Sequence, residues 1–366
     1  MQKYFLFLLT ALTVLASCRS SADNLATEEN TAAAADTDSL RLEGEKHLKN
    51  IRQLTFGGDN AEAYFSFDGS QLVFQASNPA WDDECDQIYL MSTEGYTGER
   101  AKLVSTGKGR TTCSYFMPGD STILYASTHL GGDACPEFER KPEDGYVWPL
   151  FPDFDIFEAD LEGNIVRQLT KEPGYDAEAT VSPDGKSIVF TSTRSGDLEL
   201  YTMDIDGSNV KQITDGLGYD GGAFFSPDSK KLVFRASRPV DDEAETYKSL
   251  LKEDKVKPSS MILYVCDVDG SNLQQVTELS GANWAPFFHP SGEKIIFASN
   301  HHVKSGRQFN LFMINLDGTG LEQITFDTAF DAFPMFSPDG KKLVFASNRN
   351  NGGTRDTNVF IADWVE

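Results

Sequence analysis

Short apolar runs and tight polar turns alternate along most of the chain after residue 46. The clearest unit spans residues 177–214 and contains four runs of small, β-branched and aromatic residues. Those runs occupy residues 177–181, 187–191, 199–203 and 210–214. A Ser-Pro-Asp-Gly turn at 182–185 joins the first two runs, with Pro and Gly at positions that suit a type I turn. The pattern predicts four short strands joined by turns.

This unit recurs six times at uneven intervals. Copies or variants of its first turn stand at residues 66–69, 117–120, 182–185, 226–229, 289–292 and 337–340. A fourth-strand pattern, Gln-Leu-Thr or a close variant, stands at residues 168–170, 212–214, 275–277 and 323–325, with a degraded copy at 102–104. Repeated four-stranded units of this length are blades of a β-propeller. The sequence therefore predicts an all-β fold, a six-bladed β-propeller of four-stranded blades.

The repeats are out of phase with the ends of the chain. Gln-Leu-Thr at residues 53–55 precedes the first blade, whereas the sixth blade stops just after its third strand, at residues 362–364. We therefore expect the N-terminal strand at residues 50–55 to complete the last blade and close the ring. A ring closed in this way leaves no long open sheet edge, and open edges favour aggregation.

The first residues indicate export. Lys3 precedes an apolar stretch, and Leu-Ala-Ser-Cys at residues 15–18 ends it, which is typical of a secretory signal. Leu-Ala-Ser-Cys resembles the bacterial lipoprotein box. That resemblance implies a lipoprotein signal peptide at residues 1–17 and lipidation of Cys18; an ordinary signal with an incidental cysteine is the alternative. Residues 18–46 predict a disordered tether, and residues 47–366 the propeller.

Charge and anchoring limit the partners and the location. The formal net charge is -24, which argues against a nucleic-acid partner because phosphate binding needs a basic face. Arg19 follows Cys18, and no Asp stands there to suggest retention at the inner membrane. We therefore expect a monomer, lipid-anchored in the bacterial envelope at the outer membrane, on its periplasmic or surface side.

Four further cysteines bear on disulfide formation, because an exported protein lies where disulfides persist. Cys113 opens the first strand of the second blade, and Cys135 lies in the loop after that blade's second strand. These two points share one face of a propeller and predict a Cys113–Cys135 disulfide, with Cys85 as the rival partner. Cys266, within a third strand, is expected to be a buried free thiol.

The Ser-Pro-Asp-Gly turns and the Gln-Leu-Thr strands resemble those of the TolB family over about residues 47–366. The resemblance implies a six-bladed propeller and is much less specific for function. TolB proteins carry an additional N-terminal α/β domain with no counterpart in this sequence, so a role in the Tol machinery is not implied. Similar propellers also accompany prolyl-oligopeptidase-type proteases, but the sequence contains no Gly-x-Ser-x-Gly motif.

Acidic residues stand where the predicted first strands begin, at the central mouth. Asp176, Asp220 and Asp331 occupy equivalent places, and Glu62 and Glu178 lie close by. Such a set predicts a carboxylate ring that holds a divalent ion such as calcium, or a cationic ligand. The alternative is that each Asp caps its own turn through backbone N–H groups.

The loops after the second strands lie on the same face, as do two long insertions at residues 135–153 and 239–260. These loops supply His129, Arg194 and Arg235. They predict a site for an anionic sugar or a peptide, or they are solvated loop charges. Trp148 and Phe151 of the first insertion are expected to contact a partner, or to fold over the mouth as a lid.

The sequence predicts a non-catalytic binding or scaffold protein that engages an envelope protein or glycan through this acidic, loop-rich face. We assign no catalytic residue and no cofactor. The alternative is a metal-assisted carbohydrate lyase or hydrolase with its site at the central mouth. That alternative would use His129 with the acidic ring, in the manner of the propeller lyases that degrade oligogalacturonate.

Overall fold

The computed structural model describes residues 39–303, 306–328 and 330–366, which form six four-stranded sheets and one two-stranded sheet. Each four-stranded sheet is one blade. Blade one contains β2 (Asp59–Phe65), β3 (Gln71–Ser77), β4 (Gln87–Ser92) and β5 (Lys102–Leu103). Blade two contains β6 (Thr111–Phe116), β7 (Thr122–Ser127), β9 (Asp155–Asp160) and β10 (Ile165–Gln168). Blade three contains β11 (Asp176–Val181), β12 (Ser187–Ser192), β13 (Glu199–Asp204) and β14 (Lys211–Gln212).

The second half of the chain repeats this arrangement. Blade four contains β15 (Asp220–Phe225), β16 (Lys231–Ala236), β18 (Ile262–Asp267) and β19 (Gln274–Gln275). Blade five contains β20 (Asn283–Phe288), β21 (Lys294–Ser299), β22 (Asn310–Asn315) and β23 (Glu322–Gln323). Blade six contains β24 (Asp331–Phe336), β25 (Lys342–Ser347), β26 (Asn358–Trp364) and β1 (Leu48–Gln53). The insertions add β8 (Trp148–Pro149), α1 (Asp241–Leu251), β17 (Lys255–Val256) and the 3₁₀ helices η1 (Pro79–Trp81) and η2 (Pro142–Asp144).

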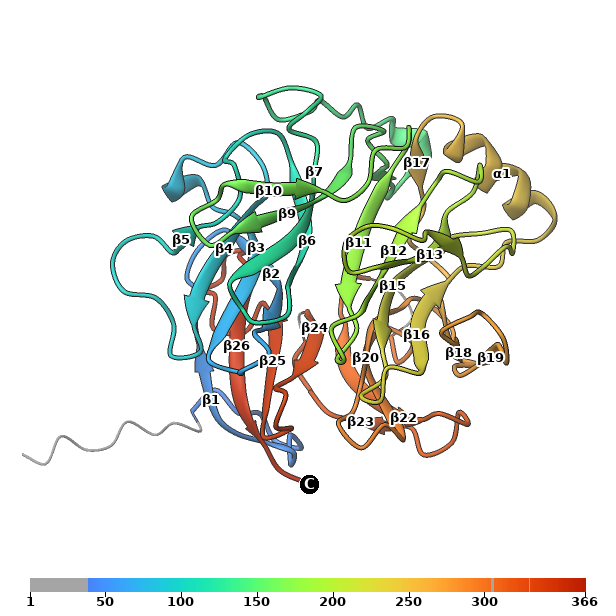
Figure 1. The fold of residues 1–366 in the computed structure, drawn as a ribbon. Coiled ribbons are helices and arrows are strands. Elements are labelled where there is room, and N and C mark those ends of the chain that lie inside the picture. The colour runs from blue at the N-terminus through green and yellow to red at the C-terminus, as the bar shows by residue number, and fades with distance from the viewer. Residues whose placement is uncertain (1–38, 304–305, 329) are drawn as a thin grey trace, which may run out of the picture. The chain divides into compact units, whose positions relative to one another are not determined.

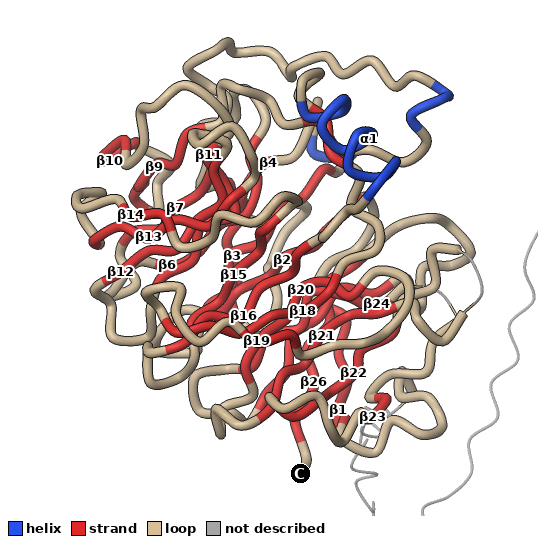
Figure 2. Tube along the Cα trace, turned by 90° about the vertical axis from the view of Figure 1, so that its right-hand side faces the viewer, coloured by secondary structure: helices blue, strands red, loops and turns tan. Residues whose placement is uncertain are grey.

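The innermost strands make a closed ring. Strands β2, β6, β11, β15, β20 and β24 contact one another in that order, and β24 returns to β2. Figure 1 shows the blades around this ring, and Figure 2 shows α1 with the longest loops at one end of it. The predicted all-β, six-bladed propeller is confirmed. Within the described ranges, no helix is both long and apolar enough to cross a bilayer.

The second strands of blades two to six are buried on both faces. Strand β25 reads Lys-Leu-Val-Phe-Ala-Ser, and every residue after Lys342 is buried. Strands β12, β16 and β21 show the same burial. Because neighbouring blades pack against both faces of such a strand, it needs an unbroken apolar run of β-branched and aromatic residues in place of alternation.

The Ser-Pro-Asp-Gly turns join the blades as well as their strands. Ser182 Oγ donates to Asp184 Oδ1 at 2.7 Å and accepts the backbone N–H of Ser187 at 3.0 Å. Gly185 has φ +70°, and a Cβ there would lie 2.8 Å from Pro118 in the turn of blade two. Glycine is therefore needed both for the left-handed backbone and for close packing of successive turns.

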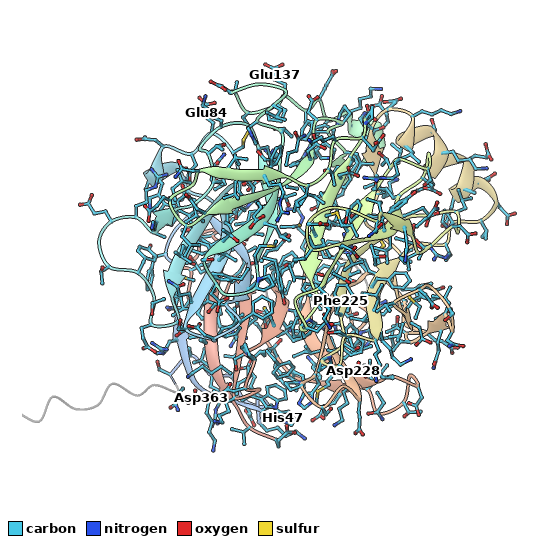
Figure 3. All side chains as sticks on the ribbon, viewed as in Figure 1. His47, Glu84, Glu137, Phe225, Asp228 and Asp363 are labelled. Atoms are coloured by element: carbon cyan, nitrogen blue, oxygen red, sulfur yellow. A yellow bond between two sulfur atoms is a disulfide. The ribbon has the colours of Figure 1, made fainter. Side chains whose placement is uncertain are left out.

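The N-terminal strand closes the ring. Strand β1 pairs antiparallel with β26, with Leu48 opposite Trp364, and the two lie side by side in Figure 1. The strand predicted at residues 50–55 is confirmed as the outer strand of blade six, although it begins at Leu48 and ends at Gln53. His47 stacks on Trp364 with ring centroids 4.9 Å apart, at the lower end of the view in Figure 3.

Residues 39–46 correct the predicted end of the tether, because they pack against the propeller. Glu45 is buried, and its Oε1 lies 2.9 Å from Arg349 Nη2. The same guanidinium nitrogen lies 3.0 Å from Asp331 Oδ2. Composition alone marks this stretch as disordered, since the arginine that Glu45 meets stands 304 residues later. The predicted signal peptide, Cys18 and the earlier part of the tether lie outside the described residues.

We expect Glu45→Ala to lower the free energy of unfolding, because it removes one of the three carboxylates that pair with the buried Arg349 guanidinium. The loss should be about 2–3 kcal/mol, below the full cost of breaking a buried pair, because Asp331 remains. Urea denaturation of the purified protein measures this value. Glu43→Ala, two residues away and exposed, is the control. Equal unfolding midpoints for the two variants would contradict the anchoring role of Glu45.

Candidate functional site

A buried acid–base pair holds the mouth end of three blades. Asp176, Asp220 and Asp331 are the first residues of β11, β15 and β24. They pair with Arg194, Arg238 and Arg349, each eighteen residues later. Arg194 Nη2 lies 2.8 Å from Asp176 Oδ2. These carboxylates therefore stabilise their own blades, and none of the three lines the central cavity.

For Asp176, Asp220 and Asp331 this pairing differs from both expectations, a metal ring and turn caps. Burial raises the pKa of Asp220 to about 6, while Arg238 opposes the rise. Burial likewise raises the pKa of Asp176, and hydrogen bonding to Ser192 and pairing with Arg194 oppose it. Within the part of the chain that the structure describes, no group of three or more His, Cys, Asp or Glu side chains is placed to hold a metal.

Two histidines take the place of the arginine in blades two and five. His129 Nδ1 lies 2.9 Å from Ser127 Oγ, and His301 Nδ1 lies 2.9 Å from Ser299 Oγ. Arg194 makes the matching contact with Ser192, also two residues before it. The His129 ring packs on the Phe157 ring, with ring centroids 4.4 Å apart. The structure thus gives His129 a position within its own blade, away from Asp176, Asp220 and Asp331.

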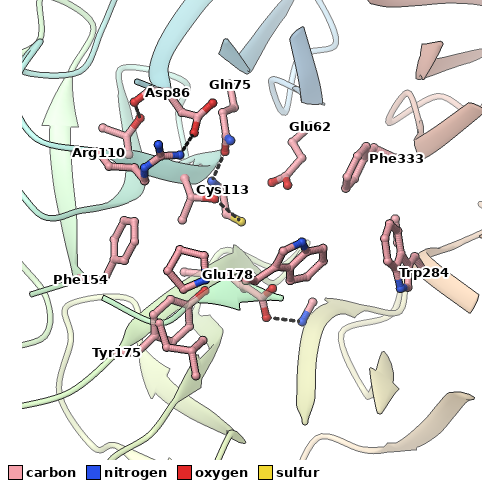
Figure 4. Close-up of a pocket in the computed structure, with 18 of the residues that line it drawn as sticks. Glu62, Gln75, Asp86, Arg110, Cys113, Phe154, Tyr175, Glu178, Trp284 and Phe333 are labelled. Atoms are coloured by element: carbon pink, nitrogen blue, oxygen red, sulfur yellow. Dashed lines mark hydrogen bonds and ion pairs between the residues drawn. The ribbon is translucent and has the colours of Figure 1, made fainter. Parts of the chain in front are cut away.

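A second set of equivalent residues does reach the central channel. Every innermost strand has a register shift close to its mouth end, of the kind that a β-bulge makes. The residues at these bulges have φ between 44° and 59° and are Glu62, Cys113, Glu178, Gly222, Ala285 and Phe333. All six line one cavity of about 340 Å³ (Figure 4). The bulges therefore turn one residue of each blade towards the channel.

The position of Cys113 corrects the predicted disulfide. Cys113 lines the channel and is a free thiol, whereas Cys85 and Cys135 form the disulfide with Cα atoms 5.9 Å apart. The bulge turns the Cys113 side chain away from the loop that contains Cys135. The bond instead joins neighbouring loops of blades one and two, next to Glu84 in Figure 3. Cys266 is a buried free thiol, as expected.

Glu178 is held firmly on one side of the channel. Its carboxylate pairs with Arg235 and accepts hydrogen bonds from Tyr219 and Thr191, both at 2.7 Å. Burial pushes the pKa of Glu178 up, but Arg235 and these hydrogen bonds outweigh burial and lower it. A Cβ on Gly222 would lie 1.7 Å from Arg235 Nη1, so only glycine leaves room for the pair.

Glu62 differs from Glu178 because it has no cationic partner of its own. Its Oε2 is buried and accepts no hydrogen bond. The Cys113 thiol interacts with the carboxyl group, and Arg235 nearby is already paired with Glu178. Burial raises the pKa of Glu62 to about 7, and Glu178 and Asp86 add to that rise. Glu62 therefore changes its charge near neutral pH.

The two insertions form a lid over this end of the channel. Strands β8 and β17 pair with Trp148 opposite Val256. Lys255, buried, lies 2.8 Å from Asp144 and 3.0 Å from Glu253. Trp148 packs 5.4 Å from Trp284 between ring centroids and lines the cavity. Of the two expectations for Trp148, the lid is the one that the structure supports.

Phe151 belongs to the same lid. It is half-buried, with its ring centroid 6.1 Å from Phe154, and it also lines the cavity. The aromatic residues of the first insertion that face the protein therefore close the channel instead of standing free as contact residues. Tyr146, half exposed, is the aromatic residue of this insertion that is most open to solvent.

A larger groove opens beside the lid, with a volume of about 1150 Å³. Loops of blades one, five and six line it, together with the end of the second insertion. Its aromatic residues are Tyr146, Trp284, Phe309 and Phe330. Trp284 stacks on Phe309 with ring centroids 4.8 Å apart. Because Tyr146 and Trp284 line both hollows, they form the wall between the groove and the channel cavity.

The fold and the capped channel define a six-bladed β-propeller with one loop-rich face. A profile of the TolB beta propeller domain matches residues 152–257 and 254–356, more than half of the chain. The chain therefore belongs to the TolB β-propeller domain family, as the repeated turns and strands predict.

Individual relatives add the fold but little detail. The chain is 22% identical to TolB from Acinetobacter baumannii. That match covers 81% of this chain and 64% of the other, with a TM-score of 0.55. A structure from Agrobacterium tumefaciens, provisionally described as TolB, is 19% identical over 84% of this chain and 91% of that one, with a TM-score of 0.51. The Tol-Pal system protein TolB of Bordetella pertussis is 53% identical over 34 residues, 9% of this chain and only 8% of that relative.

The roles of Arg238, Tyr219 and Gly222 were missed from the sequence alone, although the repeats place all three at the mouth. The spacing of eighteen residues between Asp and Arg recurs in three blades. Likewise, aligning the first strands would mark the third position of each, where Gly222 and Cys113 stand. No local signal marks Arg235 as the partner of Glu178, because the two stand 57 residues apart.

We expect Glu62→Gln to be more stable than the wild type at pH 8, by on the order of 2 kcal/mol. Burial raises the pKa of Glu62 from 4.5 to about 7, so the folded state keeps a proton that the unfolded chain releases. Wild-type stability from this group is full below pH 4.5 and is lost as the pH rises through 7. The difference between the proteins should therefore vanish near pH 4.5.

Thermal melts of both proteins between pH 4.5 and 8.5 measure the effect. Glu172→Gln, at an exposed position, is the matched control and should follow the wild type. Burial also raises the pKa of Glu199 to about 8, which leaves a shared pH dependence in all three proteins. Parallel curves of melting temperature against pH for the wild type and Glu62→Gln would contradict this prediction. They would show that Glu62 has the same pKa in the folded and the unfolded protein.

Proposed function

We propose that this protein is a non-catalytic binding module of the bacterial cell envelope. It engages a partner through the groove beside the lid. Lipidation at Cys18 would hold it to a membrane, with the outer membrane favoured by Arg19 at the following position. The residues before the propeller would act as the tether. The envelope location rests on the N-terminal sequence pattern.

The observation that carries this proposal is the make-up of the groove. Three neighbouring aromatic rings, Trp284, Phe309 and Phe330, give it a partly apolar wall, with Phe309 and Phe330 centroids 5.7 Å apart. Amide and hydroxyl side chains of the blade loops line much of the rest, and the charged lining residues are Asp59, Arg307 and Arg355. Large rigid aromatic residues surrounded by polar groups are typical of surfaces that bind other macromolecules.

The polar and charged side chains at the mouth are already used in structural contacts, and this supports binding over catalysis. His129 and the carboxylates of Asp176, Asp220 and Asp331 all serve contacts within their own blades. A lyase or hydrolase site would need such groups to converge on one reacting atom. The metal-assisted enzyme considered from the sequence therefore has no observation in its favour.

A protein partner is favoured over a glycan. The groove is wide enough, at about 1150 Å³, to receive a segment of extended chain with its side chains. The Bordetella relatives are named as parts of a Tol-Pal system, which suits a role among other proteins, although the matched region is short. With a net charge of -24 the protein would attract a basic partner, and salt would weaken the association.

We expect a photo-crosslinking amino acid at Ser259 to form an adduct with one envelope protein in living cells. Ser259 is exposed and lines the groove. Ser195 is the matched control, since it is an exposed serine in a second-strand loop, on blade three and outside the groove. Immunoblotting of the full-length protein after irradiation provides the measurement.

Three results are informative. An adduct from Ser259 alone that protease digests supports a protein partner, and Ser259→Trp should then reduce co-purification of that protein. An adduct that only glycan-cleaving enzymes remove makes the partner a glycan. Equal yields from Ser259 and Ser195, or no adduct from either, would reject the groove as the binding surface.

A further inference from the structure

The channel cavity beneath the lid contains an electrostatic imbalance that the groove does not explain. Glu178 pairs with Arg235, and Asp86 pairs with Arg110, so two of its carboxylates are neutralised. Glu62 remains, and no ion pair joins it to a basic side chain of the described residues. Arg140 also lines the cavity, but it is exposed and lies over the Phe138 ring, 6.0 Å from the ring centroid. In Figure 4 its carboxyl group points into the cavity between Cys113 and Phe333.

The unpaired oxygen of Glu62 is the main clue. Oε2 is buried and accepts no hydrogen bond from the protein. An unsatisfied buried acceptor is costly, and a carboxylate costs more than a neutral group. Such a group is retained where a ligand completes it. The cavity volume, about 340 Å³, lies at the lower end of the range for small-molecule pockets.

The apolar lining limits what that ligand is. Trp148, Trp284, Phe333 and Tyr64 all line the cavity. Aromatic faces attract cations, and organic ammonium groups are the usual ligands of such surroundings when a carboxylate is present. The neighbouring Arg235 already lies over Trp148 and Tyr219, at 5.8 Å and 4.8 Å from the ring centroids. A cation is thus compatible with the aromatic residues of this channel.

Other ligand classes fit less well. A metal ion needs several hard donors at once, and Glu62 is the only uncommitted carboxylate in the lining. An anion would be repelled by the negative charge of the Glu62 carboxylate. A neutral polar molecule could donate one hydrogen bond but would leave the carboxylate charge uncompensated in a buried site.

We infer that the lidded channel is a binding site for an organic ammonium group, which Glu62 holds by charge and hydrogen bonding while the aromatic rings pack on its carbon frame. This goes beyond the proposed partner binding in the groove. Tyr146 and Trp284 line both hollows, so the channel cavity lies next to the groove. The ammonium group therefore belongs either to a free small amine or to a lysine side chain of a partner in the groove.

Isothermal titration of the purified protein with benzylamine tests the site, with benzyl alcohol as the neutral analogue of similar shape. At pH 8 benzylamine should bind at least about tenfold more tightly than benzyl alcohol. Glu62→Gln should lower the affinity for benzylamine by at least about tenfold. Glu172→Gln, exposed and outside the cavity, should bind like the wild type. A thermal melt confirms that each variant is folded.

The pH profile gives a readout that a structural role of Glu62 alone would not move. The charged groups around Glu62 are Glu178, Asp86 and Arg235, with the Cys113 thiol in contact. Because the ammonium requires ionised Glu62, binding should weaken by about tenfold from pH 8 to pH 5.5. At pH 6.5 it should release a proton, measurable by titration in buffers of different ionisation enthalpy.

A blocked pentapeptide with one central lysine separates the two sources of the ammonium. If it binds through Glu62 and benzylamine does not, a partner's lysine is the ligand; if both bind, a free amine suffices. No Glu62-dependent binding of either probe, equal binding of the alcohol, or equal affinity in Glu62→Gln would overturn the inference. The crosslinking at Ser259 is unaffected by that result, so the two proposals fail separately.

Discussion

A buried contact between the start of an innermost strand and the position eighteen residues later holds the mouth end of three blades of this propeller. In each of them it is an Asp–Arg ion pair, as with Asp176 and Arg194. In two others a histidine stands at the arginine's position and contacts the serine that ends the second strand. Because desolvating a charge is costly, the pair must keep its geometry, and this fixes where each strand begins. The bulge close to that end then falls at one level in every blade.

That common level turns a symmetric scaffold into an asymmetric site. The same left-handed backbone presents Glu62, Cys113 and Glu178 on one side of the channel and Gly222, Ala285 and Phe333 on the other. The fold therefore supplies the positions, and the individual residues supply the chemistry. Gly222 shows how closely the two are linked, since its missing side chain makes room for the Glu178–Arg235 pair.

The site was harder to predict than the fold because its contacts are distant in sequence. Glu62, Glu178 and Arg235 were all expected at the mouth, but not that Arg235 neutralises one glutamate and leaves the other. Cys113 was expected in a disulfide, whereas the bulge turns it into the channel and Cys85 takes its place. Each of these outcomes depends on which side of a bulged strand a residue faces, and no local pattern determines that.

The sequence by itself determined the number of blades, their four-stranded form and the closure of the ring by the N-terminal strand. The blades and their strands follow from local turn chemistry and apolar runs. Closure follows because every blade needs four strands, so an extra strand before the first blade must complete the last one. Only the tertiary structure decided that residues 39–46 join the propeller, that Trp148 covers the channel and that Glu62 remains unpaired. Those features depend on contacts such as Glu45 with Arg349, which burial and charge bring together across almost the whole chain.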